Sequence, residues 1–260
     1  MDSLWRFCST AWIVYRTLFH WLNPASYLAS KVVGPFFQIL VLALLARSAG
    51  GLHAMDFAVL GNVASLVTLN GIYGVTRSVQ NERVLGTLPY VIVTPGSHVT
   101  AFLAQGLMHW ADGVVNAAVA GIIATVVVGP ILPPGHEGIA ALALVVAGWS
   151  ATCLGFGLGS LTLVVREWAF FLTNLAYAAL LAFAGVNFPT NRLPPVLRPV
   201  SLVLPLTRSL LVMRGNVRGT AAVADLGTEM LLGLTYVGIG AVLMSTLERR
   251  ARRLGLLDRL

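Results

Sequence analysis

Long apolar runs alternate with short polar segments along the chain, and this pattern predicts the architecture. The runs repeat at about 20 residues, the length that an α-helix needs to cross a hydrocarbon core about 30 Å thick. A transmembrane barrel would instead show alternating segments of about ten residues. We therefore expect an all-α membrane protein, with residues 1–260 forming one transmembrane domain. The six predicted spans lie near residues 27–46, 55–76, 99–128, 139–165, 168–186 and 225–246.

The first 23 residues are predicted to form an amphipathic helix. Arg6, Arg16 and His20 fall on one helical face, and a band of large apolar side chains falls on the other. Such a helix lies in the membrane interface, with its basic face toward the headgroups. The alternative, a first span, is less favoured because these polar residues interrupt it. The same residues break the uninterrupted apolar core that a cleavable signal peptide requires.

Charge placement predicts the orientation. The chain is 57% hydrophobic and 10% charged, against about 25% charged residues in soluble domains. With six spans both termini lie on one side, and eleven of the seventeen basic residues then share that side. Lysine and arginine favour the cytoplasmic face, so we expect both termini in the cytoplasm and the spans in the cell (inner) membrane. The net charge of +7 thus reflects topology and contact with lipid headgroups, and we expect no nucleic-acid partner.

The polar segment 77–98 joins the second and third predicted spans. Charged residues are expected to head a short cytoplasmic helix, which Gly86 and Pro89 end before Pro95-Gly96-Ser97 turns the chain back into the membrane. A rigid helix held by two spans could act as a lever, because a push on it moves both spans. The alternative is a simple solvated loop.

The segment 187–223 contains five prolines around an apolar stretch at 200–213. That stretch is too short, and too interrupted by Pro205 and Arg208, to cross a bilayer comfortably. We predict a re-entrant pair of short helices at the outer face, whose backbone polar groups are shielded by protein.

Two motifs in these segments resemble those of a known family. Asn81-Glu82-Arg83, Gly86-Thr87-Leu88 and Val93-Thr94-Pro95-Gly96-Ser97 are similar to the Glu-Arg, Gly-Thr-Leu-Glu and Pro-x-Ser elements of ABC-2 type exporter permeases. The later run Phe188-Pro189, Leu193-Pro194, Leu204-Pro205-Leu206-Thr207 and Arg214 resembles the outer region before the last span of that family. Two positions depart from the family pattern. Pro89 stands where the family commonly has an acidic residue, and Arg208 stands where the family often has a tyrosine after Pro-Leu-Thr.

The resemblance implies a permease that pairs with a second permease, identical or homologous, and with separate nucleotide-binding ATPase subunits. Those subunits would use the ATP and Mg, and this chain would bind no cofactor; its sequence carries no Gly-x-x-x-x-Gly-Lys-Ser/Thr loop. The residues implied to contact the ATPase are Arg77, Glu82, Arg83, Gly86, Thr87 and Pro95. The implied outer gate comprises Phe188, Pro189, Pro194, Pro205 and Arg208. Gly155, Gly157 and Gly159 are interpreted as small residues for close helix packing.

Polar residues within the apolar runs are candidates for a substrate pathway. Asp112 is the sharpest, because acids inside a membrane are costly and usually face a cavity or a partner. It could contact a cationic substrate, or it could be satisfied between helices, with His109 as one possible partner. Lys31 is expected to reach the interface with its long side chain. The pathway candidates are Asn62, Tyr73, Asp112, Phe170, Asn174 and Tyr177; helix packing is the alternative for the aromatic and amide residues.

The favoured function is the membrane subunit of an ATP-driven exporter of amphiphilic drugs, antibiotics or lipid-like molecules. The alternatives are a polysaccharide or lipid exporter permease and an integral-membrane lipid-modifying enzyme. Such an enzyme would need clustered acids for a metal or a catalytic constellation, and the ten acids are scattered singly. We therefore expect neither catalysis nor a metal site. An ion-coupled carrier rests on Asp112 alone and would be expected to show inverted repeats.

Overall fold

A computed structural model describes residues 9, 23–86, 98–162, 169–220 and 222–254. The predicted interfacial helix at 1–23 lies outside these residues, apart from its positions 9 and 23. Over the described ranges the protein is helical and contains no strand. The elements are α2 (Pro24–Val84), α4 (His98–Val128), α5 (Glu137–Thr162), α6 (Ala169–Phe183), η2 (Thr190–Arg192), α7 (Arg198–Val203), α8 (Thr207–Val217) and α9 (Ala224–Leu254).

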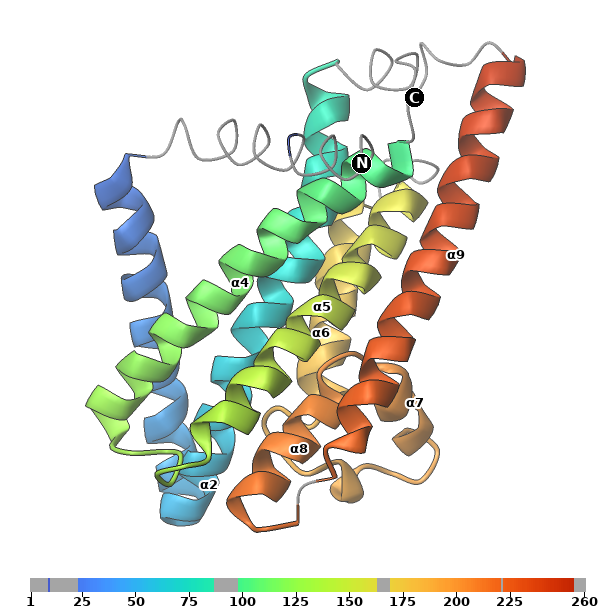
Figure 1. The fold of residues 1–260 in the computed structure, drawn as a ribbon. Coiled ribbons are helices and arrows are strands. Elements are labelled where there is room, and N and C mark those ends of the chain that lie inside the picture. Colours follow the sequence, from blue (N-terminus) through green and yellow to red (C-terminus); the bar gives the residue numbers. More distant parts are fainter. Residues whose placement is uncertain (1–8, 10–22, 87–97, 163–168, 221, 255–260) are drawn as a thin grey trace.

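Helix α2 folds back on itself and so accounts for two of the predicted spans (Figure 1). The turn lies at Gly50 and Gly51, where the backbone leaves helical geometry. Gly51 has φ +70°, a left-handed conformation that glycine adopts without steric cost. We call residues 24–49 the first arm and residues 52–84 the second arm. Pro35 lies inside the first arm without ending it.

Four helices are long and apolar enough to cross a membrane: α2, α4, α5 and α9. Helix α6 has 15 residues, about 22 Å at 1.5 Å per residue, which is less than the thickness of the hydrocarbon core. The multi-pass helical membrane architecture is therefore confirmed, whereas the count of six spans stays a prediction. Large apolar side chains exposed on α4 and α9, including Ile122, Val126, Ile239 and Val242, suit a lipid environment.

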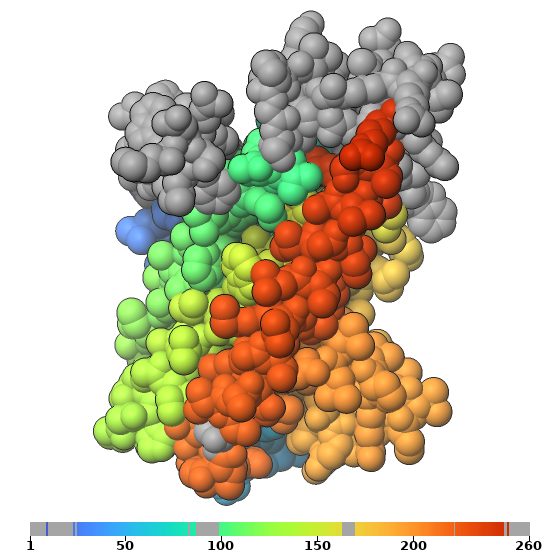
Figure 2. Space-filling view, turned by 45° about the vertical axis from the view of Figure 1, so that its right-hand side comes forward, coloured from blue at the N-terminus to red at the C-terminus, as the bar shows by residue number. Residues whose placement is uncertain are grey.

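The long helices run side by side, and the connections gather at two ends (Figure 1). The C-terminal ends of α2, α5 and α9 and the start of α4 lie together at one end, which we call the α2–α4 end. The turn of α2 lies with α7 and α8 at the opposite end, the α7–α8 end. The described residues of the predicted coupling loop, 77–86 and 98, thus lie at the opposite end of the helices from the described residues of the predicted outer region, 187–220 and 222–223. Figure 2 shows α9 lying along the long helices, with the α7 region beside its lower part.

The second arm of α2 continues past the predicted span boundary at residue 76 and ends only at Val84. Arg77 and Glu82 therefore lie on its last turns and do not head a separate helix, which corrects that prediction. The reason is local: residues 77–84 contain neither glycine nor proline. Gly86, with φ +68°, follows the helix in a left-handed conformation typical of helix ends, which confirms it as the breaking residue. Pro89 and Pro95 lie outside the described residues.

Segment 187–220 forms η2, α7 and α8, and α8 packs against α5 and α9. The predicted short helices are present. Their re-entry into a membrane stays a prediction.

The core lies where the second arm of α2, α5, α6 and α8 meet. Val67, Ile72, Ala147, Leu180 and Leu210 belong to one buried cluster there. Small residues on α5 bring its backbone close to α2. A Cβ added at Gly155 would lie 2.6 Å from the carbonyl oxygen of Gly71, closer than real side chains come. The packing interpretation of this glycine is confirmed.

We expect Gly155→Ala to lower the free energy of unfolding by about 1–3 kcal/mol, because the methyl group would push α5 off the backbone of α2. Gly157→Ala is the matched control on the same helix, since its Cβ would lie at an ordinary 3.5 Å from the carbonyl oxygen of Tyr236. Thermal unfolding of the two variants in detergent measures the difference. Equal unfolding midpoints would show that the α2–α5 contact is not tight.

Candidate functional site

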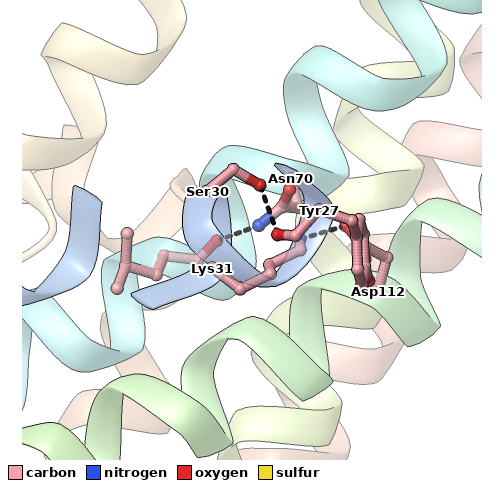
Figure 3. A network of polar contacts seen from close by, with 6 residues as sticks. Tyr27, Ser30, Lys31, Asn70 and Asp112 are labelled. Atoms are coloured by element: carbon pink, nitrogen blue, oxygen red, sulfur yellow. Dashed lines mark hydrogen bonds and ion pairs between the residues drawn. The ribbon is translucent and has the colours of Figure 1, made fainter. Parts of the chain in front are cut away.

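Asp112 forms an ion pair between α4 and the first arm of α2 (Figure 3). The Nζ of Lys31 lies 2.5 Å from Asp112 Oδ2, and the hydroxyl of Tyr27 donates to Oδ1. Both charged side chains are nearly buried, at 11% and 12% exposure. The ammonium group of Lys31 is thus held by a carboxylate of the same chain, a partner that the sequence did not indicate, and its position at the interface stays a prediction. The charge of Asp112 is compensated within the chain.

His109 has a different partner from the one expected. Its Nε2 lies 3.1 Å from the hydroxyl of Ser78 on the second arm of α2. Its ring also fills the space over Gly74, where an added Cβ would lie 2.2 Å from the ring. His109 thus packs α4 against α2, and Lys31 and Tyr27 satisfy Asp112.

Three of the pathway candidates meet between the second arm of α2 and α6. The hydroxyl of Tyr73 donates to Asn174 Oδ1 at 2.7 Å, and the rings of Tyr73 and Tyr177 pack edge to face at 5.9 Å between centroids. Phe170 is 71% exposed, and its carbonyl accepts from the side-chain amide of Asn174. We call Tyr73, Asn174 and Tyr177 the aromatic–amide cluster.

Asn62 lies apart from that cluster. It precedes Tyr73 by eleven positions, about 16 Å along a helix. Its side chain is buried and donates to Asn187 Oδ1 and to the carbonyl of Ala58, each at 2.8 Å. It connects α2 to the chain that follows α6. The six candidates therefore occupy three places, and the sequence pattern alone could not separate them.

A pocket of about 530 Å³ lies along the second arm of α2, in its half nearer the α2–α4 end. Its described lining residues are Leu69, Asn70, Tyr73, Gly74, Arg77, Ser78, Asn81 and His109. The guanidinium carbon of Arg77 lies 5.6 Å from the ring centroid of Tyr73, a cation–π distance. The pocket therefore joins Arg77, predicted for coupling, to Tyr73, predicted for the pathway.

The other predicted coupling residues are described in part. Glu82 is partly buried on the last turn of α2, and Gly86 follows that helix. The backbone of Arg83 belongs to α2, but its side chain is outside the described residues, as are Thr87 and Pro95. Arg77, Glu82 and Gly86 thus lie within three turns of one helix end.

The five predicted gate residues all lie at the α7–α8 end. Phe188 and Pro189 precede η2, and Pro194 lies between η2 and α7, where its carbonyl accepts from the amide of Leu197. Pro205 is buried before α8. Arg208 on α8 donates to the carbonyl of Leu202 at 2.6 Å. The five residues therefore lie at the same end of the protein, and their role as a gate stays a prediction.

Glu229 on α9 was missed from the sequence. Its side chain is fully buried, and its carboxylate accepts from the backbone amides of Leu206 and Ser209 and from the hydroxyl of Ser150. One carboxylate therefore ties the start of α8 to α9 and α5. Leu206 has φ +80°, the one positive φ at a non-glycine residue in the described ranges. A lone acid in the last apolar run was the available signal, the same one that identified Asp112.

Arg214 on α8 holds the other side of this region. It donates to the carbonyls of Gly185 at 2.6 Å and of Phe57 and Val186 at 3.0 Å each. Its guanidinium carbon also lies 3.4 Å from the ring centroid of Phe57. The contacts join α8 to the second arm of α2 and to the chain after α6. Sequence reasoning placed Arg214 in the outer region without this role.

Comparison with known proteins finds a matching family. A family model described as ABC-2 type transporter matches residues 9–217. The matched residues include every pathway, coupling and gate candidate, and they end within the last turn of α8. A search of curated proteins finds no significant match.

Proposed function

We propose a transport mechanism for this chain, which belongs to the ABC-2 type transporter family. The mechanism rests on the second arm of α2, which connects the two ends of the protein. It is the permease subunit of an ABC transporter, a membrane component of transport that is not itself catalytic. Such permeases normally work with a separate ATPase subunit. Our proposal concerns how that subunit moves this chain, and what the chain carries.

One unbroken helix carries the proposal. The second arm of α2 bears Arg77 and Glu82 on its last turns and Tyr73 one turn earlier. Near its start, the carbonyl of Phe57 accepts from Arg214 of α8. A helix transmits displacement along its axis because its backbone hydrogen bonds resist bending. A push at Glu82 would therefore move the aromatic–amide cluster and, at the same time, the predicted gate residues between 188 and 208, which we call the gate region.

The proposed cycle follows from this geometry. ATP-driven closure of two nucleotide-binding subunits would press on segment 77–98 and on the N-terminal segment. The second arm would move against α6 and open a route between two permease subunits toward the gate at Phe188–Arg208. In this proposal the α2–α4 end and both termini face the cytoplasm, the direction is export across the cell membrane, and ATP and Mg bind only to the partner.

Amphiphilic molecules are the proposed cargo, as drugs, antibiotics or lipid-like compounds. The support is the combination of phenol rings and amides at Tyr73, Asn174 and Tyr177, which suits ligands with both apolar and polar parts. A cationic cargo would have to compete with Lys31 for Asp112. Recognition by the aromatic–amide cluster needs no such exchange.

We expect Glu82→Ala to weaken retention of the ATPase subunit by about tenfold, because an acid on an exposed helix end can form charge-assisted hydrogen bonds with a partner. The tagged chain, coexpressed with an ATPase subunit that carries the phosphate-binding glycine loop, is purified in mild detergent. Retained subunit and ATP hydrolysis are measured. Glu137→Ala, an acid at the start of α5 and thus at the opposite end, is the control.

Unchanged retention and transport in Glu82→Ala would remove this residue from the coupling surface. Transport by the purified chain alone, without nucleotide, would overturn the whole proposal. Both outcomes can be read in proteoliposomes that contain the chain with and without its partner.

A further inference from the structure

A second pocket, of about 430 Å³, lies at the α7–α8 end, and the proposed cycle gives it no ligand. It lies between the start of the second arm of α2, the chain around η2, helix α8 and the start of α9. Its polar side chains are Thr190, Asn191, Thr207, Arg214, Arg218, Thr220 and Asp225. We call it the arginine pocket.

Arg214 brings a buried positive charge to this pocket. Its two terminal nitrogens donate to backbone carbonyls, which are neutral acceptors. Its Nε is buried and has no hydrogen-bond partner among the described residues. No described carboxylate lies within ion-pair distance of the guanidinium, since Lys31–Asp112 is the ion pair that those residues form. The charge is therefore solvated by carbonyl dipoles but not neutralised.

Thr207 adds a second unused donor. Its side chain is 1% exposed, and its hydroxyl has no hydrogen-bond partner among the described residues. A buried polar group without a partner costs about 1–3 kcal/mol. Arg214 and Thr207 both line the pocket, so an oxygen-bearing ligand that reached these two buried atoms would supply the missing acceptor.

Arg218 lies close enough to Arg214 for their charges to interact. Burial first, and then repulsion from Arg218, lower the pKa of Arg214 to about 9. The pocket is lined by two arginines, Arg214 and Arg218, and by one described acid, Asp225, in the first turn of α9. The remaining polar residues, Thr190, Asn191 and Thr220, can all donate hydrogen bonds. The pocket thus has an excess of positive charge and of donors.

We propose that the arginine pocket binds the phosphate group of a free anion or of a lipid headgroup. Guanidinium groups match phosphate because they offer several donors in a fixed plane together with a charge. A bound phosphate would accept from Arg214 Nε, Thr207 and Arg218 and would balance their charge. It would also connect α8 to η2 and α9, and so stabilise the gate region in the arrangement described here. This site lies in the region that the proposed cycle treats as the gate, but the test of phosphate binding depends neither on that cycle nor on the cargo.

Inorganic phosphate is the probe for the test. The full-length chain in detergent is titrated with phosphate at constant ionic strength, and its unfolding midpoint is followed. A ligand that binds only the folded chain raises this midpoint. We expect Arg218→Gln to weaken the apparent affinity about tenfold, the effect of losing one charge-assisted contact. Asp225→Asn should tighten it.

Arg192→Gln is the matched control, because Arg192 is an exposed arginine of η2 that does not line the pocket. It changes the net charge by the same amount as Arg218→Gln and should leave phosphate binding unchanged. Absence of a phosphate response in the wild-type chain would overturn the proposal. Equal weakening in Arg192→Gln and Arg218→Gln would also overturn it, since the effect would then be general charge screening.

The source of the phosphate is decided in nanodiscs. If discs of phosphatidylglycerol, but not of phosphatidylcholine, abolish the response to inorganic phosphate in the wild-type chain, an anionic lipid headgroup occupies the pocket. If the response persists in both, the ligand is a free anion. Either result supports the site, and the Arg218→Gln comparison is repeated in the same discs.

Discussion

Asp112→Asn should lower the free energy of unfolding by about 3–5 kcal/mol, the usual cost of removing one partner from a buried ion pair. The loss arises because the ammonium group of Lys31 would stay buried without its carboxylate. The expected structural effect is separation of the first arm of α2 from α4, since this pair and Tyr27 join them. Thermal and denaturant unfolding in detergent measure the change.

The double variant Lys31→Met with Asp112→Asn separates pairing from substrate contact. If the two residues serve each other, the double variant is more stable than the sum of the single effects predicts, and it recovers transport. If Asp112 instead recognises a cationic cargo, the double variant is stable but does not export a cationic dye. Strictly additive losses of stability would contradict the ion pair itself.

Glu229→Ala is the second large effect that we expect, at about 2–6 kcal/mol, because the buried amides of Leu206 and Ser209 would each lose their acceptor at about 1–3 kcal/mol. The start of α8 would detach from α9, so amide hydrogen exchange should increase across residues 207–217 before it increases in α5. Unfolding midpoints and exchange rates in detergent test this prediction.

Glu229→Gln keeps one oxygen as an acceptor and should lose less stability than the alanine variant. Asp56→Asn, at an exposed acid of α2, is the control for removal of a carboxylate near the same end. Uniform acceleration of exchange in all helices of Glu229→Ala would mean that the residue stabilises the whole chain and not specifically the contact between α8 and α9.

Helix positions were predictable where composition changes sharply. Residues 99–128 were expected as a span and α4 covers His98–Val128, because Pro95-Gly96 precede it and Gly129-Pro130 follow it. The last span was predicted at 225–246, and the apolar part of α9 covers Ala224–Thr246. The helix itself continues through charged residues to Leu254, and hydropathy does not mark that end. The same limitation displaced the end of α2. Apolar content marks the membrane part of a helix and not the helix itself.

From the sequence, site residues could be recognised only as single polar residues within apolar runs, without their partners. Asp112 stood out as an acid in an apolar run, yet Lys31 is 81 positions away and was assigned a different role. Glu229 and Arg214 also have distant partners, since Ser150 lies 79 positions and Phe57 157 positions away, on other helices. No periodicity within one helix identifies a partner on another helix.

The amino-acid sequence by itself determined that this chain is a helical membrane permease, because run lengths, charge placement and two short motifs are properties of neighbouring residues. Only the tertiary structure decided which polar groups satisfy one another. Buried charges and amides must find partners wherever the packed helices bring them, and those distances depend on how α2, α4, α8 and α9 lie together. The ion pair at Asp112, the carboxylate at Glu229 and the arginine pocket all follow from that packing.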